Sequence, residues 1–519
     1  MNLYILAIGG SGSRVLKALL MQYASGILPI DPVSGKPMTN VTVVPIIIDP
    51  HKDNDAVQKA NRLLLRYRDI RESLYGDKPT LDGFFGVRVQ TLKDVVAADP
   101  STSTYQISDS FIFEMPAIVS SNTFGKFIGV DDYGLSEKAP GAGLLTKMLF
   151  SDDELSTEMS EGFYGSPNIG TIALNVFQES ETYSALKSKF HEGDRLFFIG
   201  SIFGGTGAAG LPMLVSSIRQ DLQATAMSNA FMGALIVMPY FSIQSKEESA
   251  IQESDFVIKT KTALKYYIDN LYPYLNCTYY VADEAKTNGF ANDPGKDKQT
   301  TNKAHFVEYI GGLAILDFLQ QKSKEGDENA VMNYDKGRKE AAEPRKYMQF
   351  EIKEDEPLPL TFMHLGKETN KQVFVPMTSF HFLTRFMQGA FESNLSASFA
   401  KGRGLDASAY TDDMHRFFDE YKTWLTEMAA HGDGAHNFKP FEDRISNTDY
   451  SGEISGVKMK KGFTGTKKFE VSDLIKELNN SKAHEKAELP AGKLFMMIKD
   501  AMTKVVDPKN GFFETKDIL

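Results

Sequence analysis

Short apolar runs recur along the first half of the chain, and most lead into a stretch whose apolar positions repeat at helical spacing. Continuous apolar runs of this length are typical of strands buried on both faces of a parallel sheet. The alternation of strands and helices predicts an α/β fold with a doubly wound parallel sheet over about the first 285 residues. The predicted strands are Leu3–Ile8, Val41–Ile48, Leu196–Ile199, Ala230–Met238 and Thr278–Val281, and the clearest helices among them are Asn61–Leu74 and Asp255–Tyr272.

The pattern changes in the second half of the chain. Ala304–Phe318 is apolar on almost every side, which predicts a buried helix. The charge-dense residues 322–347 predict a linker. We therefore predict three parts: a first domain over residues 1–298 with an insertion at about 60–135, a buried connecting helix within 299–325, and a charged linker with an α+β domain over 326–519. Helices are predicted in the last part at Pro376–Phe391, with the proline in the first turn, and at His415–Met428, Phe469–Leu478 and Ala491–Val505.

Glycine-rich turns follow two of the predicted strands and lead into predicted helices. Glycine has no Cβ, so the backbone can come close to an anion, and a helix N-terminus offers free N–H groups and the positive end of its dipole. Both turns therefore predict phosphate binding, although a packing role for the small residues is the alternative. We expect a side chain at Gly205 or Gly207 to clash with the ligand and to leave the fold intact. The candidate residues are Gly10, Ser11, Gly12 and Ser13 in the first turn, and Gly204, Gly205, Thr206, Gly207 and Ala208 in the second.

The first turn also fits part of a dinucleotide-binding fingerprint. Gly10 and Gly12 supply the first two glycines of G-x-G-x-x-G, but Val15 stands where the third belongs. Asp49 ends the second predicted strand, where such proteins carry an acid for the ribose, yet it lies well beyond the usual distance of about 20 residues. A Rossmann-type dinucleotide-binding enzyme is therefore an open alternative.

The second turn supports a different family. The segment Gly204-Gly205-Thr206-Gly207-Ala208 is similar to the tubulin/FtsZ signature, a GGGTGSG-like loop that holds nucleotide phosphates, and Pro212 stands where FtsZ proteins carry a proline. Phe203 and Ala209 depart from the signature at its two ends. The resemblance implies a nucleotide-binding domain joined by the buried helix to an α+β C-terminal domain, GTP or GDP as the ligand, Mg²⁺ as an accompanying ion, and self-association.

The resemblance also implies roles for residues outside the glycine turns. Asp49 corresponds to a loop beside the phosphates and the metal, and Asp53 is an alternative cap of the helix that follows. A short Gly-Ala-Gly motif corresponds to the loop that contacts the terminal phosphate. Glu247 corresponds to an acid near the ribose. Asn302 and His305 correspond to the helix start beside the base. Asn302 is equally suited to cap that helix. The motif comprises Gly141, Ala142 and Gly143.

Hydrolysis in this family needs an N-x-D-x-x-D/E set that a neighbouring subunit supplies after the buried helix. The nearest match here, Asn333-Tyr334-Asp335, has Arg338 at the position of the last acid. No GxxxxGK[ST] pattern indicates a P-loop enzyme. We therefore predict a tubulin/FtsZ-like guanine-nucleotide-binding protein, filament formation included, with slow or absent GTP hydrolysis and unassigned catalytic residues. A non-hydrolysing tubulin-like scaffold is the other alternative.

Composition narrows the classes of partner. The net charge of −11 over 519 residues argues against nucleic acid as the main partner. The single cysteine, Cys277, excludes an internal disulfide and a cysteine-rich zinc site, and we predict no metal site built from protein ligands alone. No apolar run approaches the roughly 20 residues of a membrane span, and Met1–Ile8 lacks the pattern of a signal peptide. We expect a cytoplasmic protein.

Overall fold

A computed structural model describes most of the chain. It covers residues 1–519 except 52, 100–104, 121, 131–139, 164–165, 241–252, 284–302, 322–358, 402, 431–435, 444–445 and 463–464.

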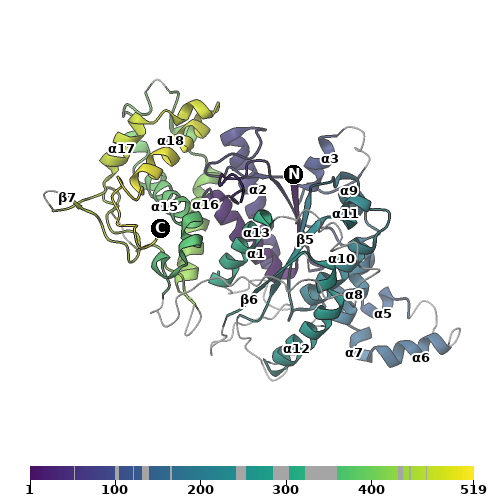
Figure 1. The fold of residues 1–519 in the computed structure, drawn as a ribbon. Helices are drawn as coiled ribbons and strands as arrows, with labels where there is room; N and C mark the ends of the chain where they lie inside the picture. Colours follow the sequence, from purple (N-terminus) through teal and green to yellow (C-terminus); the bar gives the residue numbers. More distant parts are fainter. Residues whose placement is uncertain are drawn as a thin grey trace.

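A six-stranded parallel sheet lies at the centre of the N-terminal half, with the strand order β3-β2-β1-β4-β5-β6 (Figure 1). The chain moves from β1 to β2 and β3 on one side, and then from β4 to β5 and β6 on the other. β1 and β4 therefore flank the topological switch point, where ligands of doubly wound sheets bind. The strands are β1 (Asn2–Ile8), β2 (Thr42–Ile48), β3 (Arg88–Val89), β4 (Arg195–Ser201), β5 (Phe231–Val237) and β6 (Cys277–Val281).

Helices cover both faces of the sheet, which explains why its strands are apolar at consecutive positions. Leu3, Ile5 and Ala7 of β1 belong to one apolar cluster, and the alternating residues Tyr4 and Leu6 belong to another. The first face is covered by α1 (Gly9–Ala24), α2 (Asp55–Tyr75) and α13 (Phe306–Gln320), and the second by α3 (Leu92–Ala97), α8 (Pro167–Leu174), α9 (Glu181–Lys189), α10 (Gly205–Gln220) and α12 (Glu253–Asn270). Further helices of this half are α4 (Ala117–Ser120), α5 (Phe124–Phe127), α6 (Pro140–Leu149), α7 (Asp152–Leu155) and α11 (Thr225–Ser228).

The helix α13 is buried, as its sequence predicts. Gly311 and Gly312 let it approach α1 closely: a Cβ at Gly312 would lie 2.6 Å from the side-chain oxygen of Gln22. On its other side, Tyr309 contacts Trp424 with ring centroids 6.1 Å apart. The helix therefore lies between α1 and the C-terminal helices.

The C-terminal region corrects the α+β prediction. Its described regular elements are helices apart from a hairpin of two-residue strands, and irregular segments join them. Pro376 lies inside α15 and not in its first turn, because the helix continues on both sides of the proline around buried residues such as Phe374 and Met377. The elements are α15 (Lys367–Gly389), α16 (Asp412–Ala429), α17 (Val471–Asn480), α18 (Pro490–Val505), β7 (Lys461–Gly462) and β8 (Gly465–Thr466).

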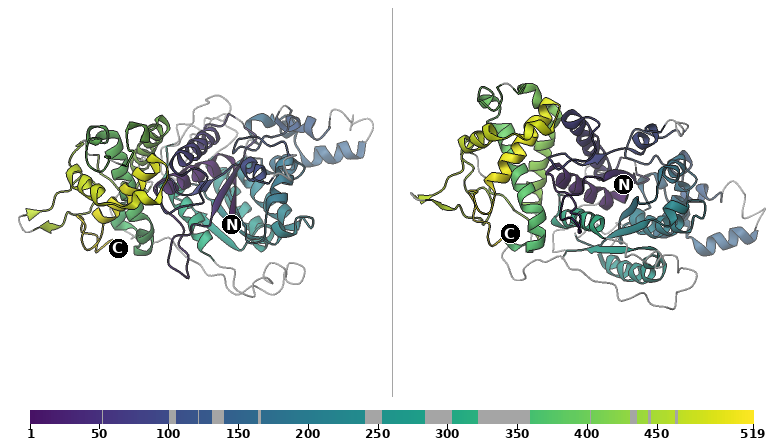
Figure 2. Two further views of the ribbon diagram at one scale, coloured as in Figure 1. Left: turned by 90° about the horizontal axis from the view of Figure 1, so that it is seen from above. Right: turned by 45° about the horizontal axis from the view of Figure 1, so that its top comes forward.

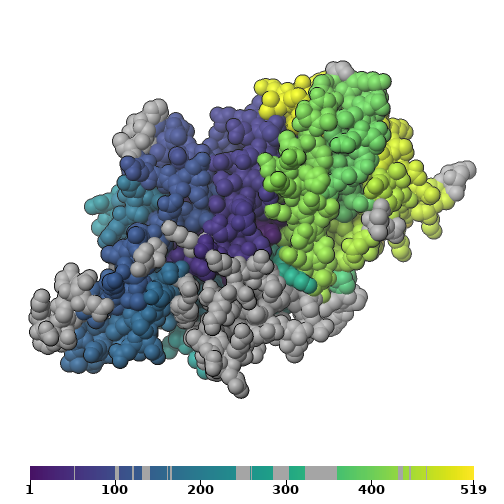
Figure 3. All heavy atoms as spheres, turned by 180° about the vertical axis from the view of Figure 1, so that it is seen from behind, coloured from purple at the N-terminus to yellow at the C-terminus, as the bar shows by residue number. Residues whose placement is uncertain are grey.

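The N-terminal and C-terminal regions share one apolar cluster, which runs from Leu3 to Ile518. Phe85 and Phe417 meet edge to face, with ring centroids 4.8 Å apart. Figure 3 shows the C-terminal residues, in green and yellow, packed directly against the purple and blue N-terminal helices. The proposed division of the chain at residues 299–325 stays a prediction.

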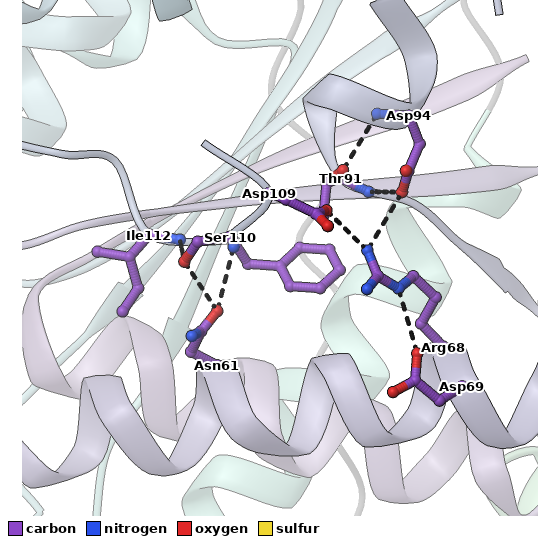
Figure 4. A network of polar contacts seen from close by, with 9 residues as sticks. Asn61, Arg68, Asp69, Thr91, Asp94, Asp109, Ser110 and Ile112 are labelled. Carbon is purple, nitrogen blue, oxygen red and sulfur yellow. Dashed lines mark hydrogen bonds and ion pairs between the residues drawn. The ribbon is translucent and has the colours of Figure 1, made fainter. Parts of the chain in front are cut away.

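The segment after α3 is held to α2 by polar contacts (Figure 4). The side-chain oxygen of Asn61 accepts hydrogen bonds from the backbone N–H of Phe111 at 3.1 Å and from the hydroxyl of Ser110 at 3.3 Å. The guanidinium of Arg68 lies 3.0 Å from a carboxylate oxygen of Asp109. These contacts fix the segment against α2. The region predicted as an insertion also contains one strand of the central sheet, β3, and most of α2.

None of the helices in the described part of the chain has both the length and the hydropathy that a membrane crossing requires.

Candidate phosphate-binding site

The helices α1 and α10 begin side by side at the switch point of the sheet. α1 directly follows β1, α10 follows β4 after a turn of three residues, and β1 and β4 are paired up to Ala7 and Ile199. A Cβ at Gly9 would lie 3.5 Å from Cβ of Thr206, so the two first turns are in contact. Gly9 has a φ of +76°, a left-handed conformation that favours glycine. The chain can therefore turn from β1 directly into α1.

Neither helix has a capped N-terminus. The N-cap residues Ile8 and Gly204 make no side-chain capping hydrogen bond, and neither first turn contains an acid. By contrast, α3 and α9 begin with capping side chains, Thr91 and Ser180, and carry an acid in the first turn. The first-turn N–H groups of α1 and α10 have no intrahelical partner, and both dipoles present their positive ends. Two such N-termini in contact form a site suited to a phosphate group.

Burial divides the glycine-turn residues into two groups with different roles. The partly exposed residues, which line the surface of the site, are Gly10, Ser11, Gly204, Gly205 and Thr206. The buried residues are Gly9, Gly12, Ser13, Gly207 and Ala208. The exposed group is therefore the one that a ligand can reach.

Two of the buried glycines, Gly12 and Gly207, serve packing. A Cβ at Gly12 would lie 2.9 Å from the carbonyl oxygen of Ile199, and one at Gly207 would lie 2.6 Å from the backbone nitrogen of Ser201. Both positions therefore let a helix approach the end of β4. This corrects the expectation that a side chain at Gly207 would block the ligand and leave the fold intact, because the side chain meets the backbone of β4 first.

Asp49 reaches this site through Asn54. One carboxylate oxygen of Asp49 accepts a hydrogen bond from the backbone N–H of His51 at 2.9 Å, and the other accepts one from the amide of Asn54 at 3.4 Å. A Cβ at Gly10 would lie only 3.3 Å from that amide nitrogen. Asn54 is also the N-cap of α2, a role expected for Asp53. The sequence analysis missed Asn54, although an asparagine directly before a helical pattern is a capping signal.

Burial raises the pKa of Asp49 to about 7, although the hydrogen bond from His51 opposes this shift. The side chain is 4% exposed. An unfolded aspartate titrates near pH ~3.9, so the folded protein binds an extra proton between about pH 4 and pH 7. The contribution of Asp49 to the free energy of unfolding therefore falls as the pH rises through that window.

The side chain of Asp49→Asn stays neutral at every pH. We therefore expect the free energy of unfolding of this variant, minus that of the parent, to rise by about 1–3 kcal/mol from pH 4.5 to pH 8. Urea unfolding at the two pH values measures the change. Asp53→Asn, at an exposed neighbouring position, is the control and should differ from the parent equally at both pH values. An Asp49→Asn difference that does not change with pH would show that this carboxyl is not the titrating group.

The Gly-Ala-Gly motif does not form the expected loop. Gly141, Ala142 and Gly143 lie in the first turn of α6. Figures 1 and 2 show α6 at the edge of the molecule, away from α1. The structure therefore does not bring these residues to the turns at Gly10 and Gly204.

Of the three residues expected at the ribose and the base, only His305 is described. Glu247 and Asn302 lie outside the described residues. His305 is 0% exposed and caps α13, because its Nδ1 accepts a hydrogen bond from the backbone N–H of Val307 at 3.0 Å. Its Nε2 lies 3.4 Å from a carboxylate oxygen of Asp283. His305 thus has the capping role expected for Asn302, and its buried ring does not offer a face to a base.

Arg14 fixes α1 against α13, a contact that the sequence analysis missed. Its Nε lies 2.6 Å from a carboxylate oxygen of Glu308, which also accepts a hydrogen bond from the hydroxyl of Tyr240 at 3.1 Å. Burial lowers the pKa of Arg14, but the adjacent Glu308 and Tyr240 raise it more, so the guanidinium stays charged. No local sequence signal connects residues so far apart in the chain.

Within the described ranges, no three His, Cys, Asp or Glu side chains are grouped closely enough to hold a metal ion. Mg²⁺ in nucleotide sites commonly takes one or two carboxylates together with phosphate oxygens and water. Asp49, at the end of β2, is suited to be such a carboxylate.

Comparisons with known proteins give little similarity. No family model matches the chain, and no curated protein matches it. One solved structure that it matches is CetZ2 from Haloferax volcanii, described as a GTPγS-bound protofilament, at 12% sequence identity and a TM-score of 0.29. The match covers 64% of this chain and 62% of the CetZ2 chain, so the chain spans less than two thirds of that protein. A similarity this weak identifies neither a family nor a ligand.

Proposed function

We propose that the protein binds a guanine nucleotide, GTP or GDP, with its phosphates at the paired N-termini of α1 and α10. The observation that supports this most is the contact between two uncapped, acid-free helix starts at the switch point. First-turn N–H groups and the hydroxyls of Ser11 and Thr206 would donate to phosphate oxygens. The choice of guanine rests on the resemblance of Gly204–Ala208 to the tubulin/FtsZ signature.

The remaining roles complete this proposal. Asp49 is assigned to Mg²⁺ on the phosphates, because a bound divalent cation favours the ionised carboxylate despite its burial. Glu247 and Asn302 are assigned to the ribose and the base on the resemblance alone. Self-association, filament formation included, is also proposed, and we expect it to depend on nucleotide binding more than on turnover.

Hydrolysis is proposed to be slow or absent. Asn333-Tyr334-Asp335 lies outside the described residues. Glu368, another acid that follows the buried helix, lies in the first turn of α15 with an exposed side chain paired to Lys371. A carboxylate in that setting is well solvated and has no feature that would activate water.

We expect GTP bound to the purified protein to persist. A missing general base or water-positioning group typically lowers the rate by about 10²–10⁴-fold. Phosphate release measured with GTP and Mg²⁺ over a range of protein concentrations should be slow and should not rise per subunit with concentration. Glu368→Ala should leave the rate unchanged. Fast phosphate release that rises with protein concentration would contradict the proposal. In that case Asp335→Ala tests whether Asn333-Tyr334-Asp335 supplies the catalytic acid.

Identification of the ligand released on denaturation tests the binding proposal directly. Guanine nucleotide in the supernatant supports it. A specific observation favours the dinucleotide alternative: the strand order β3-β2-β1-β4-β5-β6 is that of the Rossmann fold. Asp49 directly follows β2, where a ribose-binding acid lies in that fold, and it contacts Asn54, which lies beside Gly10. Release of a nicotinamide or flavin dinucleotide would decide for that function.

A further inference from the structure

An apolar cavity of about 500 Å³ lies between α8, α10 and α12, on the sheet face opposite α1. Its walls include Ile202, Phe203 and Met213, and the aromatic rings of Tyr266 and Tyr267. Of the residues assigned above to phosphate binding, only Ala208 lines it. The cavity is therefore a separate site beside the second glycine turn.

Its lining specifies the kind of ligand. None of the lining residues carries a charge, so a charged ligand would lose its hydration without gaining a counter-charge. Polar groups come from the amide of Asn168 and from hydroxyls such as those of Thr171, Ser216 and Thr262. The volume lies within the range of about 300–1,000 Å³ typical of small-molecule sites. A neutral ligand with an aromatic or aliphatic body and one or two hydrogen-bonding groups fits these walls.

The rim leaves large apolar side chains in water. Ile258 is 65% exposed and Tyr266 is 52% exposed, one on each side of Thr262 along α12. Burial of such surface is favourable by roughly 25 cal/mol per Å². A ligand in the cavity would cover both side chains.

A hydrogen bond between α12 and α10 closes the buried side of the cavity. Pro212 lies inside α10 and has no N–H, so the carbonyl of Ala208 has no donor four residues later in the helix. The hydroxyl of Tyr267 donates to that carbonyl at 3.3 Å. This bond joins α12 to α10 at the buried side, and the exposed rim remains open.

We propose that this cavity is a binding site for a neutral, largely apolar small molecule with one or two hydrogen-bonding groups. The inference goes beyond the proposed nucleotide function and does not rest on it, because the uncharged lining and not the phosphate site specifies the ligand.

Nile red, a neutral and flat aromatic dye, is a suitable probe for the full chain. Thr171→Trp on α8 and Thr262→Trp on α12 place a large ring at the rim of opposite walls. Both threonines are exposed, and their hydroxyls bond only to backbone carbonyls of their own helices, so the substitutions should preserve the fold. We expect each variant to weaken Nile red binding about tenfold or more, since the ring takes up space and apolar contact that the dye uses.

A second exposed apolar surface provides the control. Leu144 and Met148 of α6 are 63% and 75% exposed. The variant Leu144→Ser/Met148→Ser should bind Nile red as the parent does. Loss of binding in this variant with full binding in the two tryptophan variants would overturn the proposal.

Hydrogen exchange of the parent gives an independent readout should the tryptophan variants fold poorly. Saturating Nile red should slow exchange in residues 258–267 and 208–216 and leave α6 unchanged. Slowed exchange confined to α6, or none in α10 and α12, would likewise overturn the assignment.

Discussion

Gly204→Asp weakens nucleotide binding by about 100-fold or more and leaves the protein at least as stable as the parent. Gly204 is the N-cap of α10, with φ −86° and ψ 160°, a conformation open to any residue. A Cβ there would meet only the hydroxyl oxygen of Ser201, at 2.9 Å, and that side chain can rotate away. Aspartate is a preferred N-cap and favours the helix dipole, so α10 should gain a few tenths of a kcal/mol up to about 1 kcal/mol.

The same carboxylate occupies the position proposed for a phosphate. Two unit charges about 5 Å apart repel by roughly 3 kcal/mol at an effective dielectric constant of about 20, which corresponds to a loss of affinity of about 100-fold or more. The new side chain also takes the N–H groups that the phosphate would use. Binding and stability should therefore change in opposite directions.

Gly204→Asn is the matched control, because it has the same shape and capping ability without the charge. It should retain much more affinity than Gly204→Asp at similar stability. Calorimetric titration with GTP and with GDP, together with urea unfolding, measures both effects. If Gly204→Asp bound GTP and GDP as tightly as the parent does, the proposed phosphate site at the N-terminus of α10 would be wrong.

Gly207→Ala lowers the free energy of unfolding by about 1–3 kcal/mol, the range of an overpacked core. Its Cβ would lie 2.6 Å from the backbone nitrogen and 2.8 Å from the carbonyl oxygen of Ser201. Backbone atoms of a central strand cannot move aside as a side chain can, so α10 must shift away from β4.

Gly204→Ala is the control for this effect, since the same atom is added to the same turn where only the Ser201 side chain is close. We expect it to change stability by less than about 1 kcal/mol. Urea unfolding of both variants makes the comparison. If Gly207→Ala were as stable as Gly204→Ala, the packing role of Gly207 would be wrong. Together the substitutions distinguish Gly204, which is proposed to face the ligand, from Gly207, which lets α10 pack closely against β4.

The sequence by itself determined the elements whose signals are local. The apolar runs became β1, β2, β4 and β5, because a strand covered on both faces needs apolar side chains at consecutive positions. The run at Thr278–Val281 became β6, which is a partly exposed strand at the edge of the sheet. The buried helix α13 was evident because it is apolar on all sides. The glycine turns were visible as well, since few residues permit a strand to pass directly into a helix.

Local patterns misplaced the elements whose state depends on tertiary contacts. Pro376 was predicted to begin a helix, but packing around it outweighs the cost of a proline in a helix interior. The Gly-Ala-Gly motif at Gly141 was read as a loop, and it forms the start of α6. The C-terminal region was expected to be α+β, and its regular elements are mainly helices. The amphipathic segments indicated helices there, but they did not show what these helices would pack against.

Only the tertiary structure decided which small residues pack and which face a ligand. Gly204 and Gly207 look alike in the sequence. They differ because a Cβ at Gly207 would meet the backbone of Ser201, whereas one at Gly204 would meet only its side chain. The contact of Arg14 with Glu308 and the position of Asn54 between Asp49 and Gly10 likewise join residues from separate elements. Periodicity reports the environment of one element at a time, whereas a site forms where several elements meet, and that meeting depends on the packing of the whole chain.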